Sequence, residues 1–358
     1  MIRVPYNLKP AAPPRILPPS ANTLVGAIKA AKAFLEPDKG RTLVITGAGV
    51  SVESGIPDYR GPGGTYTLNK SYRPIFYSDF IERHLVRQRY WARSFLGWEA
   101  IRLAQPNRVH RAIGQLYDNG WIDNLITQNV DGLHSKYISD VTEIHGTLSA
   151  VVCLTCNSRL PRSELQRQLA ELNPDWNDLL QQELDRLERQ KRVRRDPIQD
   201  FRLNPDGDLE LPSSIRYDDF RYPVCPTCAS RGIAHALEDG QTWSQNLNEN
   251  VTVAHSHRKV KDVGVLKPDV VFFGENVDIE IRRSAEAKVE SADNILVIAS
   301  SLATFSAFRL VKEGKQAGKT IGILNMGPVR GEHEVLTDSD MRLSFVAGDV
   351  LDGIVKYL

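Results

Sequence analysis

The segment GAGVSVESGIPDYRG, spanning Gly47–Gly61, carries the residue types of a phosphate-binding loop and directly follows the apolar run RTLVIT. Gly47 and Gly49 allow the backbone to approach a pyrophosphate closely, and a following helix would direct its N–H groups at that anion. The dehydrogenase fingerprint G-x-G-x-x-G would require a glycine where Val52 stands. We therefore predict a dinucleotide loop whose chemistry is not plain hydride transfer. A structural turn is the weaker alternative, because the acid, tyrosine and arginine of the DYR triplet have no packing reason to occur together.

A second polar segment, TQNVDGLH, contributes Gln128, Asn129 and Asp131. Their amide and carboxylate groups are suited to hydrogen bonds with ribose hydroxyls and a carboxamide, although an asparagine at a strand end can also form a local turn. His145, which precedes Gly146 in TEIHGTL, would more often be structural if taken alone. Its proximity to the other polar strand ends makes it a candidate general base, since the pKa of a histidine lies near working pH.

The four cysteines of the chain form two C-x-x-C pairs. Two such pairs are typical of a tetrahedral zinc site with four thiolate ligands, although the gap between them is longer than in compact zinc ribbons. Four protein ligands leave no open position on the metal, so the predicted zinc is structural. Two redox-active motifs or buried free thiols are the alternatives. The predicted ligands are Cys153, Cys156, Cys225 and Cys228.

Apolar runs that could position these groups recur along the chain, separated by segments with helical periodicity. Continuous runs of this kind are typical of a parallel sheet that is covered on both faces. Small or polar residues follow nearly every run, and the ligands of open α/β sheets bind beyond the carboxyl ends of the strands. One extended, phosphate-bearing ligand across the sheet edge is therefore expected. The predicted strands are Leu43–Thr46, Leu125–Thr127, Val270–Phe273, Ile295–Ala299, Ile321–Leu324 and Leu343–Val346.

The strand–helix rhythm stops between Cys153 and about Gly264, where the sequence becomes polar and highly charged. We expect an α/β fold, a Rossmann-like doubly wound parallel sheet with a smaller inserted zinc-binding module. The charged run Gln181–Asp196 could bind an acidic partner, but a solvated helix face is the more common role of such a composition. The expected boundaries are 1–19 for an N-terminal extension, 20–150 and 265–358 for the Rossmann-like domain, and 151–264 for the small module with its charged insertions.

The composition is that of an ordinary globular enzyme, with 41% hydrophobic and 25% charged residues in 358. The 45 Lys and Arg against 44 Asp and Glu leave a net charge of +1. This balance gives no electrostatic case for nucleic acid or an anionic membrane as the main partner. No stretch approaches ~20 consecutive apolar residues, so no transmembrane span is expected.

The first acidic residue is Glu36, whereas basic residues occur throughout the preceding segment. The absence of acids together with scattered arginine resembles a mitochondrial presequence. Six prolines among the first twenty residues would break the amphipathic helix that such a presequence needs. A presequence and an extended surface tail are thus both open for this segment.

Taken together and in this order, the motifs resemble the sirtuins, the NAD-dependent protein lysine deacylases. The similarity extends from about Ser20 to Leu358, apart from the enlarged section between the cysteine pairs and before Lys267. The stretches that carry it are GAGVSVESGIPDYRG, TQNVDGLH, the HG dipeptide at His145, both cysteine pairs, KPDVVFFGENV, SSL and NMGP. GIPDYRG, NPDW, NPDGD, RQRYWAR and LKPDVVFFGENV look most like the class II, mitochondrial sirtuin-4 type. That type implies the mitochondrial matrix, with the cytoplasm or nucleus as alternatives.

The resemblance implies that NAD lies along the sheet edge, with its pyrophosphate on the glycine loop and its nicotinamide carboxamide at Asp58. Tyr59 would cover the ribose. The implied NAD-binding residues are Gly47, Ala48, Gly49, Asp58, Tyr59, Arg60, Gln128, Asn129, Asp131, Ser300, Ser301, Asn325, Met326, Gly327, Asp349 and Val350.

The resemblance also implies where an acyl-lysine substrate binds. The implied substrate segment is Val271, Phe272, Phe273, Gly274 and Glu275, of which the last three would pair with the substrate backbone as an added strand. Tyr90 and Arg93, in VRQRYWAR, fall where sirtuins that remove acidic acyl groups hold the distal carboxylate. The alternative is that Arg93 is simply solvated on an arginine-rich amphipathic helix.

The implied reaction begins when the acyl carbonyl oxygen attacks C1′ of the nicotinamide ribose and displaces nicotinamide. His145 then removes a proton from a ribose hydroxyl that attacks the imidate carbon, and water releases lysine and O-acyl-ADP-ribose. A mono-ADP-ribosyltransferase that uses the same NAD site is the alternative. A non-enzymatic NAD-sensing scaffold is weaker, because the implied catalytic residues are all present. They are Gln128, Asn129, Asp131 and His145.

One segment departs from the family pattern. The usual GTSLxVxP reads ASSLATFS here, with Ala299, Thr304 and Ser306 in place of Gly, Val and Pro. Thr304 and Ser306 put the contacts to the substrate loop in doubt, whereas the phosphate-binding serines remain.

Overall fold

The chain forms two compact units in the computed structural model. The structure describes residues 14–36, 40–70, 72–193, 202–210, 216–217, 219–231 and 264–358. Unit 1 comprises Met1–Tyr72, Ala104–His145 and Asn276–Leu358, and unit 2 comprises Arg73–Leu103 and Gly146–Glu275. Unit 2 therefore takes in residues 73–103, which lie inside the segment 20–150 expected for the Rossmann-like domain. It also extends beyond the expected small module, 151–264, at both ends.

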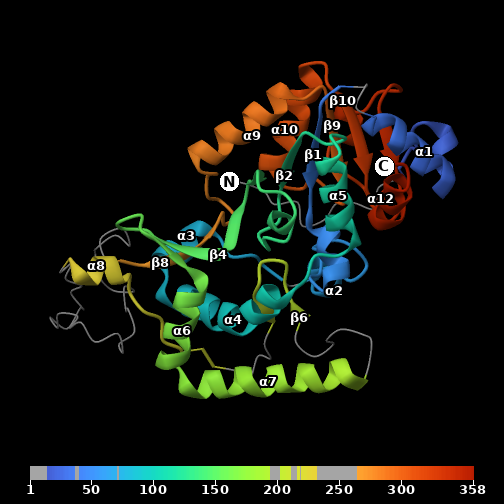
Figure 1. The fold of residues 1–358 in the computed structure, drawn as a ribbon. Helices are drawn as coiled ribbons and strands as arrows, with labels where there is room; N and C mark the ends of the chain where they lie inside the picture. Colours follow the sequence, from blue (N-terminus) through green and yellow to red (C-terminus); the bar gives the residue numbers. More distant parts are fainter. Residues whose placement is uncertain are drawn as a thin grey trace. The chain divides into compact units, whose positions relative to one another are not determined.

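Unit 1 contains a six-stranded sheet in the order β11-β10-β9-β1-β2-β3 (Figure 1). Every pair of neighbouring strands is parallel. The order reverses between β1 and β9, which is the topological switch point of a doubly wound sheet and the usual place for a ligand. The predicted Rossmann-like sheet is thereby confirmed. The strands are β1 Thr42–Thr46, β2 Asn124–Thr127, β3 Val141–Glu143, β9 Asn294–Ile298, β10 Thr320–Leu324 and β11 Met341–Leu343.

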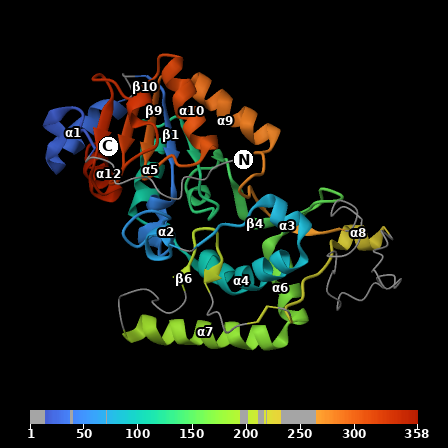
Figure 2. The ribbon, with the colours of Figure 1, turned by 180° about the vertical axis from the view of Figure 1, so that it is seen from behind.

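The helices of unit 1 cover both faces of this sheet, as Figures 1 and 2 show from opposite sides. Alternate residues of β1 point to opposite faces: Val44 packs into the core beside α1, α5 and α12, whereas Leu43 and Ile45 pack beside α9 and α10. The helices are η1 Pro19–Asn22, α1 Leu24–Leu35, η3 Ala48–Ser54, α2 Thr65–Leu68, α5 Arg108–Asp118, η4 His134–Lys136, α9 Ile279–Ser291, α10 Phe305–Gln316, α11 Glu332–Val335 and α12 Ala347–Val355.

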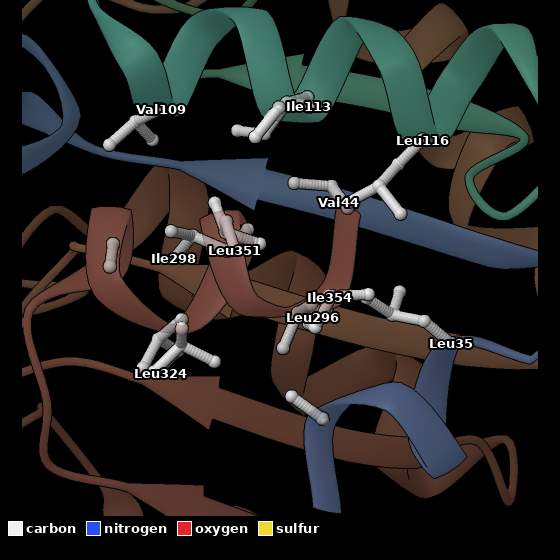
Figure 3. Packing of buried hydrophobic residues seen from close by; sticks show 14 of the residues in the cluster. Leu35, Val44, Val109, Ile113, Leu116, Leu296, Ile298, Leu324, Leu351 and Ile354 are labelled. Atoms are coloured by element: carbon white, nitrogen blue, oxygen red, sulfur yellow. The ribbon is translucent and has the colours of Figure 1, made fainter. Parts of the chain in front are cut away.

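Figure 3 shows the first of these cores at close range. Val44, Leu296 and Leu324 from three neighbouring strands are each at most 1% exposed. Ile113 of α5 and Ile354 of α12 pack in the same cluster (Figure 3). Buried on both faces, these strands must be continuously apolar, which is why their sequence lacks an alternating pattern.

Unit 2 is built on a three-stranded antiparallel sheet in the order β5-β4-β8, with a separate two-stranded β6-β7 ribbon. The strands are β4 Gly146–Cys153, β5 Arg159–Pro161, β6 Arg202–Leu203, β7 Leu209–Glu210 and β8 Leu266–Val270. The helices are α3 Tyr77–Glu82, α4 His84–Leu103, α6 Arg162–Leu172, α7 Pro174–Val193 and α8 Pro226–Ser230. The last three residues of the predicted charged run, and the insertion 232–262, lie outside the described residues.

Residues 73–103 belong with unit 2 because α4 buries polar side chains there that no hydropathy pattern reveals. Arg87 is fully buried and donates to the Phe80 carbonyl over 2.7 Å and to the Tyr222 hydroxyl over 3.2 Å. Arg162 of α6 is also buried, and its guanidinium lies 5.6 Å from the centre of the Trp91 ring, within the range of a cation–π contact.

Two of the predicted strands need correction, and one observed strand was not predicted. The strand predicted at Val270–Phe273 is wrong in position and in sheet, because β8 ends at Val270 and pairs with β4 in unit 2. The strand predicted at Leu343–Val346 lies earlier, since β11 ends at Leu343 and the chain then bends into α12. β3, at one edge of the parallel sheet, was not predicted because three residues carry too little periodicity. Among the helices in the described part of the chain, none combines the length and apolar character needed to cross a bilayer.

Candidate active site

The glycine loop after β1 is attached to the exit of β9, across the switch point. Gly47 N–H donates to the Ile298 carbonyl and Gly49 N–H to the Ala299 carbonyl, both over 3.2 Å. A Cβ added at Gly47 would lie 2.6 Å from the Cβ of Ser300. This contact is too close for any side chain, so the loop and the serine after β9 can adjoin only because residue 47 is a glycine. Ala48 begins helix η3 within the same loop.

Asn129 and Asp131 converge on one hydroxyl that the sequence analysis did not single out. The Asn129 amide donates to Ser51 Oγ over 3.1 Å, and Ser51 Oγ donates to Asp131 Oδ2 over 2.7 Å. The other oxygen of Asp131 accepts from the Leu133 N–H. Ser51 is 1% exposed, so it fixes both predicted catalytic side chains from within helix η3. Its signal in the sequence was only a polar residue inside GAGVSVESG.

Gln128 links the exits of three strands. Its Nε2 donates to the Thr46 carbonyl at the end of β1 and, over 2.7 Å, to Ser300 Oγ beyond β9. Its Oε1 accepts from Thr304 Oγ1 over 3.3 Å. Ser300, predicted to bind phosphate, and Gln128, predicted to be catalytic, are thus hydrogen-bonded to each other.

His145 is enclosed between the loop after β2 and the start of α10. Its Nδ1 lies 2.9 Å from the Gln128 carbonyl oxygen, and its Nε2 lies 2.8 Å from Ser306 Oγ. A carbonyl can only accept, so Nδ1 carries the proton. Burial lowers the pKa of His145, and the Gln128 carbonyl only partly opposes this shift. The imidazole is therefore neutral at working pH, with its basic nitrogen on the Ser306 side.

The DYR triplet has structural contacts of its own, so the expectation that it lacks a packing reason is wrong. The Tyr59 ring stacks on the Tyr66 ring at 5.7 Å between centroids, and the Arg60 guanidinium lies 5.1 Å from the same ring. Asp58 Oδ1 accepts from the Gly61 N–H over 2.8 Å. Burial nevertheless raises the pKa of Asp58. The carboxylate is half-buried, and a hydrogen-bond donor from a ligand would be favourable there.

Two arginines, Arg342 and Arg108, support segments that follow the strands of this sheet. Neither was predicted from the sequence. Arg342 is completely buried and donates to the carbonyls of Asn325 (2.7 Å) and Gly327 (2.8 Å). These contacts hold the NMG turn after β10, from which the Met326 side chain projects with 60% exposure. Ser301 lies in the loop after β9, where its carbonyl accepts from the backbone of residue 330.

Arg108 joins the glycine-loop helix η3 to α12. Its guanidinium lies 2.8 Å from Glu53, 2.8 Å from Asp349 and 3.1 Å from Asp352. Val350, the neighbour of Asp349, is fully buried and therefore serves the core. All the predicted NAD-contacting residues thus belong to unit 1 and follow strand ends of one sheet.

The four cysteines lie together in unit 2, as predicted. Their sulfurs are all within 4.8 Å of one another, with 3.6 Å between Cys153 and Cys228 and 3.7 Å between Cys156 and Cys225. Four sulfurs at a zinc–sulfur distance of about 2.3 Å in a tetrahedron lie about 3.8 Å apart. None of the cysteines forms a disulfide. The donor set and spacing therefore fit one structural zinc ion.

The predicted substrate segment leaves the sheet after β8 and folds back on itself. The buried Lys267 donates through Nζ to the Val270 carbonyl over 2.5 Å and contacts Glu275 over 3.2 Å. Glu275 also accepts from the Phe272 N–H. Phe273 forms a single parallel bridge with residue 76, and a positive φ of 83° at the next residue, Gly274, begins the turn. Val271 therefore lies in a connecting segment and not in a strand.

Tyr90 and Arg93 are both buried in unit 2. The Tyr90 ring packs edge-on against Phe80 and Phe272, with centroids 5.7 and 5.4 Å away. Arg93 forms an ion pair with Asp208 over 3.0 Å, and its Nε donates to the Leu209 carbonyl over 2.7 Å. The alternative of a solvated Arg93 is wrong, because the side chain is 9% exposed. Its charge already has a carboxylate partner within the fold.

This fold and site define a protein with a Rossmann-type nucleotide-binding sheet and a separate four-cysteine metal centre. Residues 47–306 match the Sir2 family. A relative from Batrachochytrium dendrobatidis, "NAD-dependent protein deacylase SIR4", is 41% identical over 319 residues, which cover 87% of this chain and 90% of the relative. The Drosophila melanogaster "NAD-dependent protein deacylase Sirt4" is 33% identical over 321 residues, or 89% and 84% of the two chains. The chain belongs to the Sir2 family, the sirtuins.

Solved structures agree on the fold. One described as "Sir2-p53 peptide-NAD+" has a TM-score of 0.60 at 21% identity and covers 92% of this chain and 98% of its own. Another, "Structural Basis for the Mechanism and Regulation of Sir2 Enzymes", has a TM-score of 0.58 at 24% identity, with coverage of 92% and 96%. At these identities the likeness establishes the architecture alone.

Proposed function

We propose that this protein is an NAD-dependent protein lysine deacylase that releases nicotinamide and O-acyl-ADP-ribose. The observation that carries the proposal is His145, a neutral imidazole whose basic nitrogen lies among the polar strand ends of a doubly wound sheet. A histidine in this state can accept a proton from a hydroxyl group. The relatives named as NAD-dependent deacylases support the same reaction class.

The residues of unit 1 fit an extended dinucleotide. Gly47 and Gly49 let the loop pack directly against residues 299 and 300 at the switch point. The backbone of this loop would bind the pyrophosphate, and Ser300 offers a hydroxyl beside it. Asp58, whose carboxylate is half-buried, would accept from the carboxamide. When bound, NAD supplies a ribose carbon whose bond to nicotinamide can be broken.

Each polar residue then has a role that its contacts support. His145 would accept the proton of a ribose hydroxyl at Nε2. Asn129 and Asp131, oriented through Ser51, would hold the ribose hydroxyls. Gln128 would position the ring of His145 through its backbone carbonyl while its side chain ties the site to the serine after β9.

The substrate side remains a proposal built on unit 2. Phe273, Gly274 and Glu275 would bind the backbone of an acyl-lysine protein segment beside β8. Acidic acyl groups such as succinyl or glutaryl would need Arg93 to exchange Asp208 for the acyl carboxylate, because the guanidinium is paired in this structure. We also propose the mitochondrial matrix as the location, on the acid-poor sequence before Glu36 and the class II motifs.

Product analysis tests the function. The protein is incubated with NAD and a panel of acetyl-, succinyl-, glutaryl- and hydroxymethylglutaryl-lysine peptides, and products are identified by mass spectrometry. O-acyl-ADP-ribose with the free lysine peptide is expected, and His145→Ala should lower its formation about 10²–10⁴-fold. ADP-ribose on an acceptor protein instead would mean a mono-ADP-ribosyltransferase. No product from any peptide, together with NAD binding, would leave an NAD-sensing scaffold.

A further inference from the structure

Two of the residues that depart from the family segment place hydroxyl groups on the predicted catalytic residues. Thr304 is the residue before helix α10 and contacts Gln128 Oε1 through its hydroxyl. Ser306, in the first turn of the same helix, lies 2.8 Å from His145 Nε2. A valine and a proline at these positions could make neither contact, so this chain has a hydrogen-bond shell that the pattern GTSLxVxP lacks.

The direction of the bond to Ser306 follows from the other side of the ring. The Gln128 carbonyl has no hydrogen to donate, so the Nδ1 of His145, 2.9 Å away, must be its donor. A neutral imidazole has one N–H, which leaves Nε2 as a bare acceptor. Ser306 Oγ–H therefore donates to Nε2. The arrangement is a hydroxyl, an imidazole and a carbonyl in series.

We infer that Ser306 is a positioning residue that fixes the imidazole ring of His145 through Nε2 and covers this proton-accepting nitrogen, in the Nδ1–H tautomer that the Gln128 carbonyl sets. The inference rests on the proposed function for its catalytic meaning, since it concerns the base of that reaction. Ser306 contacts the base itself and takes no part in making or breaking a bond. In the reaction, a ribose hydroxyl would take the place of Ser306 at Nε2, its O–H bond would break, and its proton would move to Nε2.

The surroundings of His145 should let the Ser306 hydroxyl change the pKa of the ring measurably. Burial lowers the pKa of His145 and the Gln128 carbonyl raises it, and no charged side chain of the described residues is a cause of the shift. The charged groups on the packed elements are otherwise engaged or lie on a neighbouring strand. They are Asp131, bonded to Ser51; Arg309 of α10, paired with Glu286 and Glu313; and Glu143 at the end of β3.

The Ser306 hydroxyl can donate to Nε2 of the neutral imidazole and, after rotation, accept from the Nε2–H of the imidazolium. The second bond is charge-assisted and the stronger of the two, so removal of the hydroxyl should lower the pKa of His145. One hydrogen bond of ordinary strength corresponds to a shift of about half to one pH unit. Ser306→Ala removes the donor, whereas Ser306→Thr keeps a hydroxyl on the same carbon and serves as the matched control. The fold should tolerate both substitutions, since Ser306 is half-buried at a helix start.

The direct test is the ¹⁵N NMR titration of the histidine rings in the full chain without NAD, with His145 assigned by its absence in His145→Ala. We expect the Nδ1–H tautomer in the wild type, a downward pKa shift of about half to one unit in Ser306→Ala, and the wild-type titration in Ser306→Thr. An Nε2–H tautomer in the wild type, or the same titration in Ser306→Ala and the wild type, would overturn the inference.

The kinetic test uses the acid limb of the pH profile of kcat/KM on an acyl-lysine peptide. In Ser306→Ala this limb should move to lower pH by the same amount, which raises activity on the limb about three- to tenfold relative to the wild type. If the limb does not move in Ser306→Ala and His145→Ala is inactive, the role of Ser306 is refuted and the proposed base is retained. Full activity in His145→Ala would instead remove the proposed base, and the NMR titration would still decide the tautomer.

Discussion

Replacing Arg93 by leucine should destabilise unit 2 strongly, because it leaves a buried carboxylate without its cation. The side chains of Arg93 and Asp208 are 9% and 6% exposed, and their charged atoms lie 3.0 Å apart. Removing one partner of a buried ion pair costs about 3–5 kcal/mol. The Leu209 carbonyl also loses a donor at 2.7 Å, so we expect the upper half of that range.

A second variant separates the charge from the loss of packing. Asp208 also accepts from the Asn204 side chain over 2.7 Å, and an asparagine at position 208 keeps an oxygen for that bond. The double variant Arg93→Leu, Asp208→Asn carries no buried charge at either position. It should therefore recover about 2 kcal/mol of the loss seen in Arg93→Leu, as expected for charge pairs that are buried together.

Urea unfolding followed by tryptophan fluorescence measures both variants, because Trp91 and Trp98 lie on the same helix as Arg93. An Arg93→Leu variant within 0.5 kcal/mol of the wild type (the usual range for a surface position) would refute the buried pair. A double variant no more stable than Arg93→Leu would show that packing, and not charge, accounts for the loss. Only variants that fold should then be compared on succinyl- and acetyl-lysine peptides, where a selective rise in KM for the acidic group would support substrate binding by Arg93.

Three further predictions follow from other parts of the structure. Fresh protein should contain one zinc per chain by elemental analysis, and Cys228→Ser should lose it and lower the thermal midpoint, since metal-binding energy is folding energy at such sites; a zinc-free wild type would contradict the assignment. Burial lowers the pKa of His110 to about 4 and that of His134 to about 3, so the unfolded chain binds protons first as pH falls below about 6.5. The free energy of unfolding should therefore decline from that pH towards 4 by at most about 1.4 kcal/mol per pH unit for each histidine. Urea unfolding at pH 7 and pH 5 measures this decline, and an equal decline in His134→Gln would argue against this origin. Ala299 has a positive φ of 50°, which strains a residue with a Cβ, so Ala299→Gly should be stabilised by about 1 kcal/mol; a lower unfolding midpoint would show that the site tolerates the alanine without strain.

Much of the site could be predicted because its residues are grouped in short segments with distinctive chemistry. The glycine loop, TQNVDGLH and the cysteine pairs each contain several functional residues within a few positions, and each follows a recognisable strand or turn. A parallel sheet brings the carboxyl ends of its strands to one edge. Gly47, Gln128 and Ser300 therefore had to lie near one another once the strands were recognised, and the structure places Gln128 in direct contact with Ser300.

The tertiary structure alone decided which polar side chains are paired with each other. Arg93 and Asp208 are far apart in the chain, as are His145 and Ser306, and each residue type is compatible with a solvated role until its partner is known. The membership of β8 in unit 2 was also decided by the tertiary structure, because its partner strand is β4, which lies far away in the sequence. Local pattern reports what a residue could do, whereas burial and hydrogen bonding between distant segments set its charge, its tautomer and its partner. A buried ionic or polar group is stable only when a matching group meets it, and that match is a property of the folded chain.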